Sequence, residues 1–137
     1  KRRVSQRERF VFFDLGVRNA AADLMPGPDI VNALGGSLFE QWVGIELWKR
    51  LQYRGDGRLH HMRTEDGAEV DYVIEIGNRL IPIEVKWNEH PSASDGRHVR
   101  AFLREHPEKA SQGWIVCRCA RPMQIEEKIT ALPWWGM

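Results

Sequence analysis

Hydrophobic and polar positions alternate over residues 69–87, and this pattern predicts two β-strands joined by a tight turn at Gly77-Asn78. Successive side chains of a strand point to opposite faces, so Asp71 and Val73 share one face of the first strand. One face of the second strand carries Leu80, Pro82, Glu84 and Lys86. The other carries Ile81, Ile83, Val85 and Trp87. Asp71, Glu84 and Lys86 can therefore meet at one place on this hairpin.

Helical periodicity is strongest from about Gly35 to Tyr53, where apolar residues cover an arc wide enough to predict a largely buried helix. A shorter helix is expected after Asp14, which is suited to cap it. A third helix, capped by Ser94 or Asp95, is expected to run to about Glu105. Further strands are predicted over residues 10–13, 59–64, 113–118 and 123–125.

From residue 35 the elements run helix, strand, strand, strand, helix, strand, which predicts an α/β fold with a mixed central sheet flanked by helices (an αβββαβ core). A length of 137 residues fits one domain, expected over residues 10–137. Residues 1–9 are expected to be a basic linker, because five of them are Lys or Arg. The chain begins with Lys1 rather than Met, so we expect it to be a piece of a longer protein.

Composition narrows the possible classes of protein only slightly. Hydrophobic residues make up 42% and charged residues 28%, which is an ordinary globular balance, and the net charge of +1 points to no particular partner. Cys117 and Cys119 alone cannot complete a four-ligand zinc site. We therefore expect both cysteines to be reduced and to serve as packing residues of a cytoplasmic protein. No apolar run reaches the ~18 residues that indicate a membrane span, so no membrane association is expected.

The candidate site consists of Glu40, Asp71, Glu84 and Lys86. Magnesium prefers oxygen ligands and keeps several waters, so two carboxylates and a backbone carbonyl, such as that of Val85, can be enough protein ligation. Lys86 would then orient an attacking water and offset charge on a phosphate. Glu40 lies on an apolar stripe of its helix, where it could hold a water, a second metal ion or a buried arginine. The same pattern also fits simple salt bridges between strand carboxylates and a lysine.

The order of elements and the spacing of the acids resemble the PD-(D/E)xK restriction-endonuclease-like superfamily. In this sequence Asp71 is followed by twelve residues and then by Glu84-Val85-Lys86. More closely, several segments are similar to an uncharacterised C-terminal domain of bacterial and archaeal AAA-type ATPases. These segments are FVFFDLGVRNA, GSLFEQWVGIEL, GAEVDYVIE, LIPIEVK and LPW, and the resemblance runs from about Arg9 to Trp135.

The resemblance implies a role for each residue of the candidate site. Asp71 and Glu84 match the metal-binding acids, Lys86 matches the catalytic lysine, and Glu40 matches the helical glutamate that often completes the site. It implies an endonuclease that uses Mg²⁺ or Mn²⁺ and acts on DNA. ATP would bind only to an N-terminal ATPase portion, because no GxxxxGK[ST] motif occurs here.

A shared fold does not establish activity, so three functions remain open. The first is a metal-dependent DNA phosphodiesterase. The second is a non-cleaving module that uses the same pocket to hold nucleic acid, or to hold a metal ion structurally. The third is a protein-interaction domain that regulates the attached ATPase and keeps these acids as a polar network in its core. The sequence does not indicate an oligomeric state.

Overall fold

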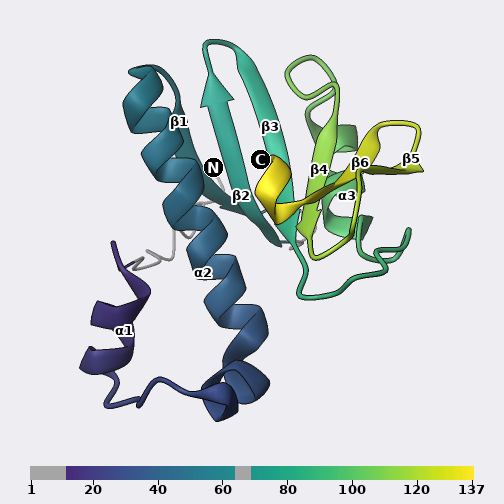
Figure 1. Ribbon diagram of the computed structural model, residues 1–137. Helices are drawn as coiled ribbons and strands as arrows, with labels where there is room; N and C mark the ends of the chain where they lie inside the picture. The colour runs from purple at the N-terminus through teal and green to yellow at the C-terminus, as the bar shows by residue number, and fades with distance from the viewer. Residues whose placement is uncertain (1–11, 64–68) are drawn as a thin grey trace.

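The computed structural model describes residues 12–63 and 69–137, which form a six-stranded mixed sheet with helix α2 on one face and helix α3 on the other (Figure 1). This arrangement confirms the predicted α/β class and the order of the core elements. The elements are α1 (Leu15–Ala21), α2 (Pro28–Arg54), β1 (Arg58–Arg63), β2 (Glu69–Ile76), β3 (Arg79–Val85), α3 (Arg97–Glu105), β4 (Gly113–Cys117), β5 (Met123–Glu126), β6 (Ile129–Pro133) and a final 3₁₀ turn, η1 (Trp134–Gly136).

The strands lie in the order β1-β2-β3-β4-β6-β5. The pairs β1–β2, β2–β3 and β5–β6 are antiparallel, whereas β3–β4 and β4–β6 are parallel. A parallel pair needs a crossover connection, and α3 provides it between β3 and β4. The predicted hairpin between β2 and β3 is confirmed, and Gly77 adopts φ 59°, a left-handed conformation that glycine reaches without a steric cost. The centre of the sheet is therefore a rigid platform for the candidate site.

Each face of the sheet has its own hydrophobic layer. The layer toward α3 includes Val70, Val73, Val99, Phe102, Ile115, Cys117 and Cys119. The layer toward α2 includes Phe39, Val43, Leu47, Tyr72, Ile83, Val85 and Val116. Both cysteines are buried, and burial raises the pKa of the Cys117 thiol to about 12, so this thiol stays protonated at neutral pH. The expectation that the cysteines are packing residues is confirmed.

Helix α2 is longer and less buried than the sequence predicted. It begins at Pro28 rather than near Gly35, because proline is well suited to the first position of a helix. It ends at Gly55, whose φ of 75° gives the left-handed C-cap. The sheet covers only one side of α2, so the wide apolar arc includes residues on the open side. Trp48, for example, is 51% exposed, and the prediction of a largely buried helix was wrong.

The N-terminal predictions were partly right. Helix α1 follows Asp14, whose side chain accepts a hydrogen bond from the Val17 N–H at 3.0 Å, as an N-cap should. Phe12 and Phe13 lie outside any strand and are exposed, so the strand predicted over residues 10–13 is wrong for the half that is described. The basic segment 1–9 lies outside the described residues.

One further prediction needs correction, and one strand was not predicted. Helix α3 begins after Gly96, and Asp95 does not cap it, because its carboxylate instead accepts the Ser92 N–H at 2.9 Å. Strand β6, which pairs in parallel with β4, was not predicted.

In the part of the chain that is described, every helix is too short or too polar to cross a membrane.

Candidate metal centre

The β2–β3 hairpin brings Asp71, Glu84 and Lys86 to one end of the sheet. Asp71 lies near the start of β2, and Glu84 lies near the end of the antiparallel strand β3. Tyr72 pairs with Ile83. Asp71 precedes Tyr72 and Glu84 follows Ile83, so in this antiparallel pair both acids lie on the same side of the Tyr72–Ile83 pair. Lys86 follows directly after β3. The three side chains that the period-2 pattern placed together are therefore neighbours in the structure.

A β-bulge directs the Asp71 side chain. His60 pairs with Val73 and Met62 pairs with Val70, so β2 carries one more residue than β1 over this stretch. The Val85 N–H then donates to Asp71 Oδ2 at 2.8 Å, where a regular ladder would offer a backbone carbonyl. The carboxylate of Asp71 is thus fixed by the backbone of the strand that carries Glu84.

Lys86 forms an ion pair with Glu84 at the edge of the buried region. Lys86 Nζ donates to Glu84 Oε1 at 2.8 Å. Glu84 is 2% exposed, whereas the Lys86 side chain is 33% exposed, so the cluster reaches the surface at the lysine. Burial lowers the pKa of Lys86, but the hydrogen bond and charge of Glu84 outweigh this effect and the pKa lies above its ordinary value. Lys86 therefore remains an ammonium group that donates hydrogen bonds.

The two acids carry more negative charge than their surroundings balance. Burial, and then the charge of Glu84, raise the pKa of Asp71 to about 7 despite the hydrogen bond from Val85. Burial likewise raises the pKa of Glu84, although Lys86 opposes this. Glu84 Oε2 is buried and has no hydrogen-bond partner among the described residues. A buried carboxylate oxygen without a partner is costly, and a cation would relieve that cost.

Helix α2 brings Glu40 into electrostatic range of this pair. The charge of Glu40 raises the pKa of both Asp71 and Glu84. The Tyr72 hydroxyl donates to the Glu40 backbone carbonyl at 3.0 Å, which links α2 to the residue after Asp71. The ring of Tyr72 passes so close to Gly44 that a Cβ there would lie 2.4 Å from the hydroxyl oxygen. Packing between α2 and β2 therefore sets the position of the fourth predicted residue.

Two histidines contact the site without having been predicted as part of it. His98, in the first turn of α3, places Nδ1 3.4 Å from Glu84 Oε1. His61 Nδ1 lies 2.8 Å from the backbone carbonyl of Asp71. His98 belongs to no motif. The only available signal was its position beside Val99 on the apolar edge of the helix.

The donor set fits a hard divalent cation that keeps several waters. Within residues 12–63 and 69–137, no group of three or more His, Cys, Asp and Glu side chains is arranged to hold a metal ion. A magnesium site can be built from fewer side chains, because one or two carboxylates and a carbonyl are supplemented by water. Asp71 and the unpartnered oxygen of Glu84 meet this requirement, and the Val85 backbone is adjacent to both.

Comparison with known proteins identifies a family and a fold. Residues 35–137 match the protein family described as "Domain of unknown function (DUF4143)". No curated protein matches the sequence. One similar solved structure is a chain from the half-complex of a tetradecameric assembly of Thermococcus gammatolerans McrB AAA+ hexamers with bound McrC. The TM-score is 0.50 at 16% sequence identity, over 72% of this chain and 27% of that chain. At this identity the similarity is one of fold.

Proposed function

The chain belongs to the DUF4143 family. We propose that it is a magnesium- or manganese-dependent DNA phosphodiesterase attached to an AAA-type ATPase. One observation carries the proposal. Glu84 Oε2 is buried without a partner in the described part of the chain, next to an acid whose pKa is raised to about 7. Such a pair is suited to binding a divalent cation when the acids are ionised.

Asp71, Glu84 and the Val85 carbonyl would hold the ion. When bound, the ion would polarise a phosphodiester and lower the pKa of a water molecule. The Lys86 ammonium would donate to the attacking water and offset charge on the phosphate, and its raised pKa argues against a role as general base. Glu40 would hold a water molecule at the edge of the site. Together these groups would form the site of a PD-(D/E)xK restriction-endonuclease-like domain.

Association with an ATPase is supported by two separate similarities. The segments around Glu40, Asp71 and Glu84 resemble the C-terminal domain of AAA-type ATPases, and the structural similarity is to a complex that contains AAA+ hexamers. The 137 residues contain no phosphate-binding loop, so ATP would be bound by another part of a longer protein.

The test is cleavage of single-stranded, double-stranded and supercoiled DNA in the presence of Mg²⁺ or Mn²⁺. Glu84→Gln and Lys86→Ala should each lower the rate by at least about 100-fold, because Glu84 would hold the metal ion and Lys86 would offset charge on the reacting phosphate. Glu89→Gln is the matched control, since Glu89 is an exposed carboxylate that pairs with Arg118. Absence of cleavage of every DNA form by the parent protein, in the presence of its ATPase and ATP, would contradict the proposal.

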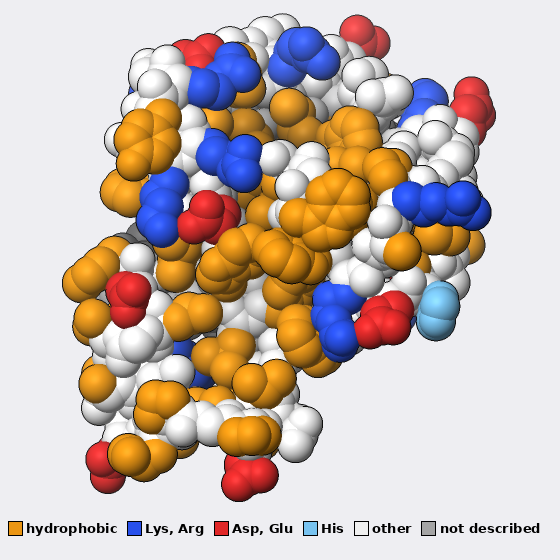
Figure 2. Space-filling view, in the orientation of Figure 1, with side chains coloured by type: hydrophobic (Ala, Val, Ile, Leu, Met, Phe, Trp, Pro, Cys, Tyr) orange, Lys and Arg blue, Asp and Glu red, His pale blue; other side chains and the backbone are white. Residues whose placement is uncertain are grey.

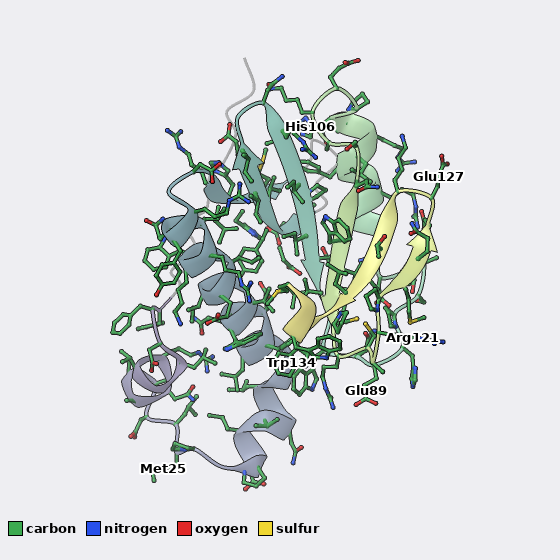
Figure 3. All side chains as sticks on the ribbon, turned by 45° about the horizontal axis from the view of Figure 1, so that its top comes forward. Met25, Glu89, His106, Arg121, Glu127 and Trp134 are labelled. Atoms are coloured by element: carbon green, nitrogen blue, oxygen red, sulfur yellow. The ribbon has the colours of Figure 1, made fainter. Side chains whose placement is uncertain are left out.

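A second candidate function, protein interaction, is favoured by the apolar face in Figure 2. Hydrophobic side chains gather there over α1, α2 and the C-terminal turn. Tyr53 is 90% exposed and Trp135 is 61% exposed. Trp134 lies beside α2 (Figure 3), with its ring 5.4 Å from that of Trp42 in an edge-to-face arrangement. An apolar face of this kind is typical of a protein-binding surface.

If the domain regulates an ATPase through this face, Trp48→Glu in the full-length protein should change the ATPase rate without affecting DNA cleavage. Lys49→Glu is the control, because it changes charge at an adjacent exposed position of the same helix. An unchanged ATPase rate in Trp48→Glu would exclude regulation through this surface.

A further inference from the structure

His98 approaches one side of the buried Glu84 carboxylate. Its Nδ1 atom lies 3.4 Å from Glu84 Oε1, which is also the oxygen that accepts the hydrogen bond from Lys86 Nζ at 2.8 Å. The other oxygen, Oε2, is buried and has no partner within residues 12–63 and 69–137. Lys86 and His98 therefore both contact the same oxygen of this carboxylate, Oε1.

Arg97 determines which nitrogen of His98 carries the hydrogen. Arg97 Nε donates to His98 Nε2 at 3.0 Å, and a guanidinium group has no acceptor. Nε2 must then accept, so Nδ1 carries the hydrogen and faces Glu84.

His98 lies in the first turn of α3, the helix that covers the face of the sheet opposite α2. The side chain of His98 is 25% exposed, so solvent reaches only part of it. One imidazole of α3 thus reaches the strand that carries Glu84, a metal-binding acid of the proposed function, and this is the geometry of a group that orients a metal ligand.

We infer that His98, held by Arg97, is a positioning residue that fixes the Glu84 carboxylate through Oε1 and leaves Oε2 to bind the divalent cation. This inference rests on the proposed metal site and adds a residue to it. Outer-shell partners of this kind orient ligands before the ion arrives, and their loss typically weakens metal affinity by about 10–100-fold.

The test is a titration of the 137-residue chain with Mn²⁺, in which electron paramagnetic resonance measures the concentration of the free ion. His98→Ala should weaken Mn²⁺ binding by about 10-fold. His98→Asn should restore binding to within about 3-fold of the parent protein, because its amide can donate from the position of Nδ1–H. Arg97→Ala should weaken binding less than His98→Ala, since it only releases the imidazole. His90→Ala, at an exposed position in the loop before α3, is the control and should bind as the parent does.

A second readout separates positioning from folding. Melting temperatures measured without metal should differ little between His98→Ala and His98→Asn, although their Mn²⁺ affinities differ. In a cleavage assay, His98→Ala should regain most of the parent rate at saturating metal, because its defect is in ligand orientation.

The outcomes distinguish the inference from the function on which it rests. Equal Mn²⁺ affinity of His98→Ala and the parent protein would overturn the role of His98 and leave the metal site standing. Failure of His98→Asn to restore affinity, with the fold intact, would overturn the role of Nδ1–H. A parent protein that binds no Mn²⁺ would overturn both the proposed function and this inference.

Discussion

The side chain of Asp71 accepts a hydrogen bond from the backbone N–H of Val85 at 2.8 Å, and this bond joins β2 to β3 beside the bulge in the β1–β2 ladder. The carboxylate of a proposed metal ligand thereby takes the place of a backbone acceptor. Its position depends on the sheet rather than on a flexible loop. The same arrangement buries the carboxylate next to Glu84, and several measurable properties follow from that.

Stability of the metal-free domain should fall as the pH rises from about 4 to about 7. The folded-state pKa of Asp71 is raised from 3.8 to about 7, so in this window the folded protein holds a proton that the unfolded chain has released. The raised pKa of Glu84 acts in the same direction. Asp71 lowers the free energy of unfolding by at most about 4 kcal/mol over this range. Urea denaturation in the presence of EDTA, at pH 5 and at pH 8, measures the decrease between these two pH values.

Asp71→Asn is the control for this pH dependence, because an amide can still accept the Val85 N–H but does not ionise. Between pH 4 and 7, the free energy of unfolding of the variant should change much less with pH than that of the parent protein. At pH 8 the variant should be more stable than the parent protein. Identical slopes for the variant and the parent would show that Asp71 titrates normally.

Divalent cations should stabilise the folded protein at pH 8, because they bind the ionised acids only in the folded state. If the dissociation constant is of the order of 1 mM, 10 mM Mg²⁺ adds about 1.4 kcal/mol. Thermal melts with and without Mg²⁺ test this, with Glu84→Gln as a variant that should no longer respond. A parent melting temperature that neither Mg²⁺ nor Mn²⁺ raises would count against the site.

Removal of Lys86 alone should destabilise the fold more than removal of both members of the ion pair. Lys86→Met leaves Glu84 Oε1 buried without its ammonium partner, which should cost about 1–3 kcal/mol at pH 8. Adding Glu84→Gln to this variant removes the buried charge, so the double variant should recover part of the loss. A double-mutant cycle from denaturation curves measures the coupling, and strictly additive losses would refute it.

Gly44 should tolerate no side chain. A Cβ at this position would lie 2.4 Å from the Tyr72 hydroxyl oxygen, so Gly44→Ala should lower the free energy of unfolding by about 1–3 kcal/mol and displace the strand next to Asp71. Gly36→Ala, in the same helix, is the control, because its nearest neighbour, the Trp87 Cβ, would be 3.8 Å away. Gly36→Ala should be neutral or stabilising by up to about 1 kcal/mol. Equal effects of the two substitutions would contradict this packing.

The hairpin and the approach of Asp71 to Glu84 could be predicted because strand alternation and the Gly77-Asn78 turn are local signals. The bulge could not, since a strict period of two contains no extra residue. Val70 and Val73 both face the α3 layer as a consequence, although alternation places them on opposite faces.

The remaining differences arise from tertiary packing. Periodicity identified the apolar arc of α2 but did not show how much of it the sheet would cover, so the exposure of Trp48 was missed. Strand β6 was missed because its pairing with β4 is long-range. His98 was missed because its contact with Glu84 arises only when α3 packs across the sheet.

A Mn²⁺-soaked crystal at pH 8 can show whether the acids bind a divalent cation, because manganese has an anomalous signal that identifies it. We expect an anomalous peak bonded to the Asp71 carboxylate and to Glu84 Oε2, and no such peak in crystals of Glu84→Gln. Crystals saturated with Mn²⁺ that show no peak between Asp71 and Glu84 would contradict this expectation.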